Sequence, residues 1–125
     1  DTLYTRRHYT MAKAWAYDKV VEGMRSAVER GTCRAANNPQ YAVCGKTGTA
    51  QNRGQDHSVF MGFAPMDKPK IAIAVYVENG GFGADFGVPI GALMMEQYIN
   101  GKLSENSKKK ADDFHNRHIY YGSNH

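Results

Sequence analysis

The chain has 125 residues, a formal net charge of +4, and 42% hydrophobic and 11% aromatic residues. This length suits one domain or a piece of one, and the hydrophobic content excludes a wholly disordered chain. The longest apolar run, Ile71 to Val77, is far shorter than the ~20 residues that a membrane-spanning helix needs. Because the chain begins at Asp1 and not at a methionine, we expect it to be a piece of a longer protein.

Two helices are predicted from the spacing of apolar residues. Apolar side chains fall on one face over residues 18–30. Asp18 is expected to cap the first turn of this helix, and Gly31 is expected to end it in a left-handed conformation. A second apolar stripe covers residues 89–100 and is followed directly by Gly101, so the second helix is expected to end there.

Three strands are predicted between the helices, at residues 41–51, 58–64 and 70–78. The run Ile71 to Val77 is rich in β-branched residues and is typical of a buried strand. The segment Pro65 to Pro69 has the length and composition of a hairpin turn, which makes its neighbouring strands antiparallel. We therefore expect an α+β fold with an antiparallel sheet flanked by helices, and a flexible glycine loop at residues 79–83.

The composition changes after Gly101. From residue 102 to residue 125, Lys, Ser, Asn, Asp and His dominate, which predicts a mobile tail after a domain at residues 1–101. The lysines at 108–110 are followed closely by aspartates and are interpreted as a solvated charge run. Nucleic-acid binders concentrate Lys and Arg on one face or helix. A small basic nucleic-acid or scaffold protein is therefore disfavoured, and no nucleic-acid partner is expected.

The segment Lys46-Thr47-Gly48-Thr49 carries the clearest chemical signal. On a strand edge, Lys46 offers an ammonium, and the alternating Thr47 and Thr49 place their hydroxyls on one face. Gly48 has no side chain, so an extended ligand can approach the strand closely. Together these residues could bind a carboxylate and pair with a peptide by strand addition. The alternative is that Lys46 is an ordinary solvent-exposed lysine and that Gly48 marks a bulge.

Histidines give weaker signals. His57 follows Asp56 and could form an acid–base pair, but adjacent strand side chains point to opposite faces, so we favour a structural role at a strand junction. His115 and His118 have a spacing that occurs in metal sites. Because a polar tail lacks the fixed surroundings that such sites use, no metal and no cofactor is expected.

The motif and the segments that follow it resemble one protein family. Gly45 to Gln51, Asp56-His57, Gly62 to Pro65 and Glu78 to Gly81 follow one another in the order found in class B penicillin-binding proteins. The resemblance runs from Val20 to Gly101 and covers the C-terminal part of the transpeptidase domain. The Glu78-Asn79-Gly80-Gly81 stretch is typical of the cell-elongation type, penicillin-binding protein 2.

This resemblance implies a serine β-lactamase-like fold and a D,D-transpeptidase that cross-links peptidoglycan stem peptides ending in D-alanyl-D-alanine. It also implies covalent binding of β-lactam antibiotics and a partnership with the cell-elongation machinery. The expected location is the periplasmic face of the bacterial inner membrane, with an N-terminal anchor helix outside this chain. Lys46 and Thr49 are the implied catalytic residues: Lys46 supplies positive charge and shares in proton transfer, and the Thr49 N–H is an oxyanion-hole donor. Thr47, Gly48 and Thr49 are the implied substrate-binding residues, with Thr49 contacting the substrate carboxylate.

The sequence departs from the family pattern at the nucleophile. Ser-x-x-Lys and Ser-x-Asn should precede Lys46, yet such spacings occur here only at Ser107 to Lys110 and at Ser104 to Asn106, inside the tail. We interpret both as coincidences of a low-complexity segment and expect the isolated chain to be inactive, since covalent catalysis needs a nucleophile in contact with its base. A non-catalytic β-lactam sensor and a division-type penicillin-binding protein remain alternatives, which the Glu78 to Gly81 stretch disfavours.

The two cysteines, Cys33 and Cys44, could pair or stay free on composition alone. Their short separation, together with the periplasmic setting that the resemblance implies, predicts a disulfide between them.

Overall fold

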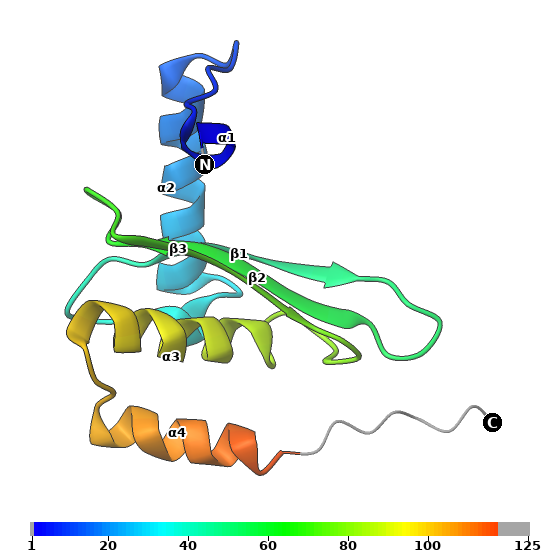
Figure 1. Ribbon diagram of the computed structural model, residues 1–125. Helices are drawn as coiled ribbons and strands as arrows, with labels where there is room; N and C mark the ends of the chain where they lie inside the picture. The colour runs from blue at the N-terminus through cyan, green and yellow to red at the C-terminus, as the bar shows by residue number, and fades with distance from the viewer. Residues whose placement is uncertain (1, 118–125) are drawn as a thin grey trace.

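The computed structural model describes residues 2–117. Its elements are α1 (Thr2–Thr5), α2 (Ala14–Arg30), the 3-10 turn η1 (Arg34–Ala36), β1 (Cys44–Ala50), β2 (His57–Ala64), β3 (Ile71–Val77), α3 (Gly87–Asn100) and α4 (Glu105–His115). The three strands form one antiparallel sheet in the order β1-β2-β3 (Figure 1). The predicted α+β class and its antiparallel sheet are confirmed.

Helix α2 ends at Arg30 as predicted, but its start and the conformation of the residue after it differ from the prediction. It begins at Ala14, so Asp18 lies inside the helix, and the N-cap position belongs to Lys13 without a side-chain cap. At the other end, Gly31 has a φ of −113° and is not left-handed. Glycine suits this position because an added Cβ would lie 2.9 Å from the backbone of Ala27. Helix α3 ends before Gly101 as predicted, and Gly101 is left-handed, with a φ of 73°.

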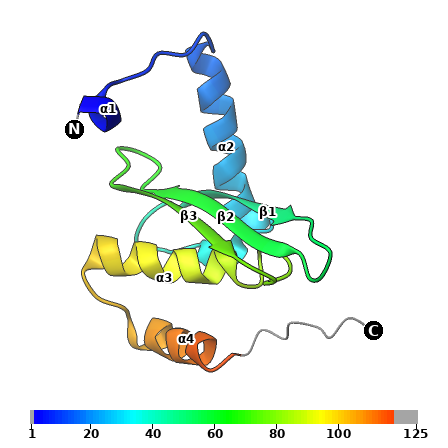
Figure 2. The ribbon, with the colours of Figure 1, turned by 45° about the vertical axis from the view of Figure 1, so that its right-hand side comes forward.

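The register of the sheet assigns each side chain to a face. Thr47 and Thr49 of β1 lie opposite Phe60 and Ser58 of β2, and Phe60 in turn lies opposite Val75 of β3. Helix α3 packs on this face and covers the core, while α4 lies beyond α3 and the N-terminal part of α2 projects from the opposite side of the sheet (Figures 1 and 2). The other face of β1 carries Lys46.

The ring of Phe60 lies in a socket of glycines. Phe60 is fully buried, and an added Cβ at any of four glycines would come within 3.1 Å of its side chain. These glycines are Gly45, Gly62, Gly87 and Gly91. Because none of them has a side chain, α3 and the sheet can close around the ring, and this contact fixes the position of α3 against β1 and β2.

Strand β3 is covered on one face only within the described residues, whereas its sequence predicted a buried strand. Ile71, Ile73 and Val75 pack against the core, but their neighbours toward the other face are exposed, and Tyr76 has 57% of its surface exposed. A continuous apolar run does not distinguish one-sided from two-sided burial, because alanine fits both.

Residues 105–115 form helix α4, whereas the sequence predicted a mobile tail from residue 102 onward. Ser104 caps this helix by accepting a hydrogen bond from the Ser107 N–H. The buried carboxylate of Glu96 on α3 accepts hydrogen bonds from the Ser104 N–H and the Ser107 hydroxyl. An edge-to-face contact between Phe86 and Phe114 adds an apolar attachment. The part of the predicted tail from residue 118 to residue 125 lies outside the described residues.

Substituting Ser104 with alanine should therefore weaken α4 by about 1 kcal/mol, the usual cost of removing a helix cap. Amide hydrogen exchange over residues 108–115 should be slow in the unmodified protein and faster in Ser104→Ala. Asn106→Ala is the matched control, because Asn106 is exposed in the same turn and its side chain makes no hydrogen bond to any residue from 2 to 117. Unprotected amides in the unmodified protein would instead support the mobile tail.

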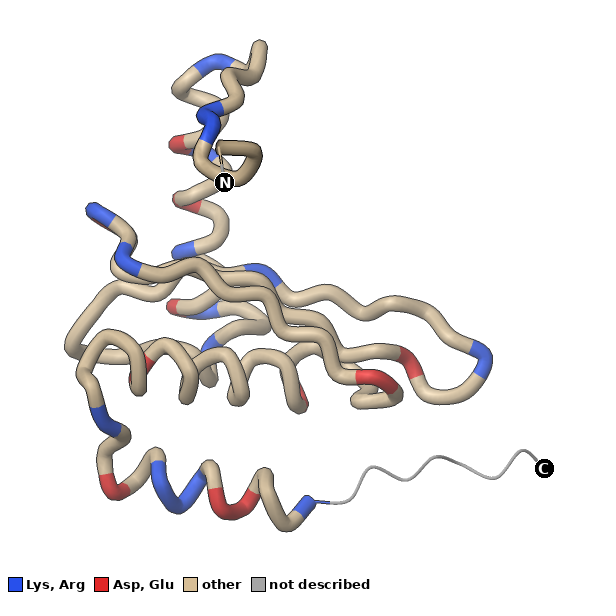
Figure 3. Tube along the Cα trace, viewed as in Figure 1, with Lys and Arg blue, Asp and Glu red and all other residues tan. Residues whose placement is uncertain are grey.

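Charged residues are interleaved over the described part of the chain. Figure 3 shows Lys and Arg on α2, in the β2–β3 turn and on α4, with Asp and Glu between them on both helices. Ion pairs join Arg25 to Glu29 on α2 and Lys108 to Glu105 on α4. Within residues 2–117, no helix is long and apolar enough to cross a membrane.

Candidate active site at the sheet edge

Strand β1 brings the predicted site residues to one edge of the sheet. Among the described strands, β1 pairs with β2 alone, so its other side is an edge. The pairing is continuous from Cys44 to Ala50 and includes Gly48 opposite Val59, which rules out the bulge considered for Gly48. Thr47 and Thr49 share one face, as predicted, whereas Lys46 lies on the other face. A ligand can therefore contact both the lysine and the threonines only if it lies along the edge of β1, which borders both faces of the sheet.

Lys46 is exposed at the edge of β1. The Nζ atom donates a hydrogen bond to the carbonyl of Thr47 over 2.7 Å. This contact folds the lysine along its own strand, beside the flat surface left by Gly48, where an added Cβ would meet only Val59 at 3.6 Å or more. The arrangement can place a positive charge and two hydroxyls next to an extended ligand that carries a carboxylate.

The start of β1 is fixed by helix α2. Arg25 donates a hydrogen bond from Nη1 to the carbonyl of Val43 over 2.7 Å, and its Nε lies 3.3 Å from the Glu29 carboxylate. The side chain of Arg25 is only 20% exposed, so this charge-assisted contact is partly shielded from water and strengthened by that shielding.

The glycine loop after β3 packs on the face of β1 that carries Thr47. Gly83 is buried, and an added Cβ would lie 2.8 Å from the Gly48 carbonyl and 3.0 Å from the Thr47 Cβ. The buried Ser58 holds this loop, since its hydroxyl donates to the Phe82 carbonyl over 2.8 Å and accepts from the Gly87 N–H over 3.0 Å. The sequence predicted a flexible loop. Its glycines instead allow a close backbone contact with β1.

Thr32 is a site neighbour that the sequence analysis did not single out. It lies just after α2, and its hydroxyl oxygen is 2.8 Å from that of Thr47. Neither Thr32 nor Gly83 stands near the Lys46 motif in sequence, and no local pattern in the chain marks either contact.

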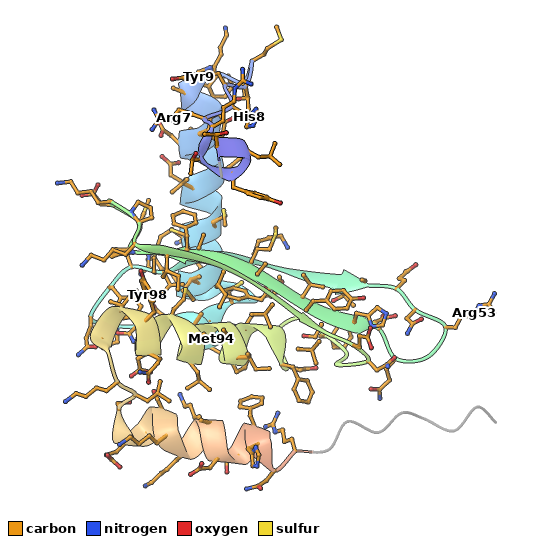
Figure 4. The ribbon with its side chains drawn as sticks, viewed as in Figure 1. Arg7, His8, Tyr9, Arg53, Met94 and Tyr98 are labelled. Atoms are coloured by element: carbon orange, nitrogen blue, oxygen red, sulfur yellow. The ribbon has the colours of Figure 1, made fainter. Side chains whose placement is uncertain are left out.

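His57 has the structural role that the sequence analysis favoured. Its Nδ1 accepts a hydrogen bond from the Asn79 N–H over 3.0 Å, and its ring lies 5.1 Å from that of Tyr76. Asp56 accepts from the backbone of Asn52 through its carboxylate and from Gly81 through its carbonyl. These contacts join the β1–β2 loop, whose tip carries Arg53 (Figure 4), to the glycine loop. His118, the second histidine of the spacing considered for a metal site, lies outside the described residues.

The predicted disulfide between Cys33 and Cys44 is wrong, because both cysteines are free and buried. Cys33 belongs to the core cluster, whereas Cys44 lies near Arg25 and Glu29 of α2. Burial raises the pKa of the Cys33 thiol, although the Thr32 hydroxyl and the Lys46 charge act in the opposite direction. Burial also raises the pKa of the Cys44 thiol. Both thiols are therefore held in the neutral form, which is unreactive toward disulfide exchange.

A cavity of about 540 Å³ lies away from β1, between η1, α3 and α4. Its lining includes Tyr41, Glu96 and Ser107. Burial, with a further contribution from the Glu96 carboxylate, raises the pKa of Tyr41 to about 12. The Ser107 of the Ser-x-x-Lys spacing thus faces Glu96 on α3, and α3 separates it from the sheet (Figures 1 and 2).

Comparison with known proteins identifies the family. The family model of the penicillin-binding protein transpeptidase domain matches residues 7–97. The chain belongs to this family. The match covers the whole sheet, the Lys46 motif, Thr32 and nearly all of α3, and it ends before α4.

Named relatives agree with this transpeptidase family. The peptidoglycan D,D-transpeptidase MrdA of Acinetobacter baumannii is 43% identical over an alignment of 81 residues, and the match covers 52% of this chain and 12% of that protein. Pseudomonas aeruginosa PBP2, in complex with WCK 5153, is similar with a TM-score of 0.65 at 38% identity, over 78% of this chain and 23% of that one. The penicillin G acyl-enzyme complex of penicillin-binding protein A from Mycobacterium tuberculosis gives a TM-score of 0.59 at 30% identity, over 73% and 22%. The chain therefore spans 12% of the length of the MrdA relative.

Proposed function

We propose that the complete protein is a serine D,D-transpeptidase that cross-links peptidoglycan stem peptides during cell elongation. The observation that carries this proposal is the edge strand β1, with the Lys46 ammonium and the Thr47 and Thr49 hydroxyls at one sheet edge. Membership of the transpeptidase family and the name of the MrdA relative support the reaction class.

In the proposed reaction, a serine attacks the carbonyl carbon of the D-alanyl-D-alanine peptide bond. The terminal D-alanine leaves with a proton on its amine, and an amine of a neighbouring stem peptide then takes the acyl group and releases the serine. Lys46 supplies positive charge and shares in the proton transfers. The Thr47 and Thr49 hydroxyls bind the terminal carboxylate, and the Thr49 N–H donates to the oxyanion, a contact worth about 10²–10³ in rate.

We place the nucleophilic serine in a part of the complete protein outside these 125 residues. The Ser-x-x-Lys spacing within the sequence begins at Ser107, whose hydroxyl is bonded to the Glu96 carboxylate. A serine nucleophile needs a base that it contacts directly, and Ser107 contacts a helix-capping carboxylate remote from β1. The isolated chain should therefore not react with penicillin.

The proposed setting is the periplasmic face of the bacterial inner membrane, with an anchor helix outside this sequence and the cell-elongation machinery as partner. The Glu78-Asn79-Gly80-Gly81 stretch and the similarity to P. aeruginosa PBP2 support the elongation type over the division type. In the same proposal, β-lactam antibiotics acylate the serine because they resemble the D-alanyl-D-alanine end.

The test is intact-mass spectrometry after incubation with penicillin G, together with release of D-alanine from a stem peptide ending in D-alanyl-D-alanine. The complete protein should gain the mass of a single penicillin and release D-alanine, and the 125-residue chain should do neither. A complete protein that binds penicillin but never releases D-alanine would point to a β-lactam sensor. A stoichiometric adduct on the 125-residue chain would overturn the assignment of the nucleophile and return attention to Ser107.

A further inference from the structure

Thr32 and Thr47 form a contact between a helix end and the strand that carries the site. Their hydroxyl oxygens are 2.8 Å apart, and either hydroxyl can be the donor. A threonine hydroxyl has one hydrogen to donate and two lone pairs that accept. The Thr32 hydroxyl also lies 4.0 Å from Cys33 Sγ, and either atom can be the donor of that longer contact. If the Cys33 thiol donates to Thr32 and Thr32 donates to Thr47, the hydrogen of Thr47 stays available for another acceptor. A substrate carboxylate is such an acceptor, and it takes a charge-assisted hydrogen bond.

Thr32 is held in place independently of Thr47. The residues on either side of it, Gly31 and Cys33, both donate their N–H groups to the Ala27 carbonyl over 3.0 Å. Cys33 is fully buried in the core cluster. The hydrogen bonds of its two neighbours therefore fix the backbone position of Thr32 at the end of α2, and with it the point from which the Thr32 side chain extends.

Thr47 is also restricted on its other side. Gly83 approaches so closely that an added Cβ there would lie 3.0 Å from the Thr47 Cβ. Because Thr47 is β-branched, it has few χ1 conformations to choose from. The Thr32 hydroxyl and the Gly83 backbone together select one direction for the Thr47 hydroxyl at the edge of β1.

We propose that Thr32 is a positioning residue, whose hydroxyl donates to Thr47 Oγ1 and so orients the Thr47 hydrogen toward the carboxylate of the substrate or antibiotic. This inference rests on the proposed transpeptidase function and adds a residue outside the Lys46 to Thr49 motif. Thr32 does not touch the ligand. It acts through Thr47.

The test measures the second-order rate constant of acylation of the complete protein by penicillin G. Thr32→Val keeps the shape of the side chain and removes the hydroxyl, and it should lower this constant about fivefold to tenfold, the usual effect of losing one hydrogen bond. Thr32→Ser keeps the hydroxyl and should restore the rate to within about twofold. In a Thr47→Val background, Thr32→Val should have no further effect, because the hydroxyl through which it acts is gone.

Penicillin G methyl ester separates positioning from a general structural effect. It lacks the charged carboxylate, so Thr32→Val should acylate with the ester as fast as the unmodified protein does. An equal loss with the acid and the ester, or an equal loss in the Thr47→Val background, would overturn the positioning role. If the unmodified complete protein takes up no penicillin, the proposed function falls and this inference falls with it. If it is acylated and Thr32→Val is acylated equally fast, only the inference falls.

Discussion

Replacing Lys46 with alanine in the complete protein should slow acylation by penicillin about 100-fold to 1,000-fold, the range found when one preorganised donor is removed from an active site. The reason is that the Lys46 ammonium is exposed at the edge of β1 and, within the described residues, donates its hydrogen bond to the Thr47 carbonyl of its own strand. Its loss removes charge from the site and leaves the core intact. The free energy of unfolding should accordingly change by less than about 0.5 kcal/mol.

Lys109→Ala is the matched control for this experiment, because it removes the same charge from an exposed position on α4. It should leave both the acylation rate and the free energy of unfolding unchanged. Lys46→Arg keeps the charge and alters the geometry, and an intermediate rate would show that the position of the charge matters. A Lys46→Ala protein acylated at the unmodified rate would remove Lys46 from the catalytic residues.

The second large effect is expected from alanine at Gly91. An added Cβ at Gly91 would lie 2.5 Å from the ring of Phe60, which is fully buried. The ring would have to leave its position, and such overpacking costs about 1–3 kcal/mol. Chemical denaturation should show this loss, although alanine has a better helix propensity than glycine.

Gly23 provides the comparison, because it lies in the interior of α2 with no atom within 4 Å of an added Cβ. Gly23→Ala should stabilise the protein by about 0.5–1 kcal/mol through helix propensity alone. The two substitutions are chemically identical and should have opposite signs. If Gly91→Ala also stabilised the protein, the close contact between α3 and Phe60 would be disproved.

The strands and α3 could be predicted from the sequence because their signals are local. Alternating and continuous apolar runs, hairpin-length turns and a terminal glycine were enough to place β1, β2, β3 and α3 within a few residues. Helix α4 could not be predicted, because the Glu96 carboxylate that anchors its first turn belongs to α3. The start of α2 was missed for a related reason: Asp18 is a good capping residue, but nothing in the sequence requires a helix to begin at it.

In the candidate site, too, the local motif could be predicted from the sequence, whereas its tertiary contacts could not. Lys46, Thr47, Gly48 and Thr49 form one contiguous motif, and the rule that alternate strand residues share a face predicted correctly that the two hydroxyls lie together. The contacts that hold the motif come from Thr32 and Gly83, which approach Thr47 through tertiary structure. The disulfide prediction failed because sequence separation gives the length of a loop, whereas pairing depends on where each thiol is directed.

The glycines around Phe60 also couple the effects of substitutions at positions that are far apart in the sequence. The space at Gly91 is set by the Phe60 ring, so a smaller side chain at residue 60 would open room for a methyl group there. At Gly62 the Cys44 carbonyl, 2.9 Å from an added Cβ, would still block a methyl group. Substitutions at residues 60 and 91 should be strongly non-additive, as expected for residues that share one packing site. An alanine at Gly91 that is damaging beside phenylalanine could be accepted beside leucine, and sequence drift in this domain would then have to pass through residue 60 first.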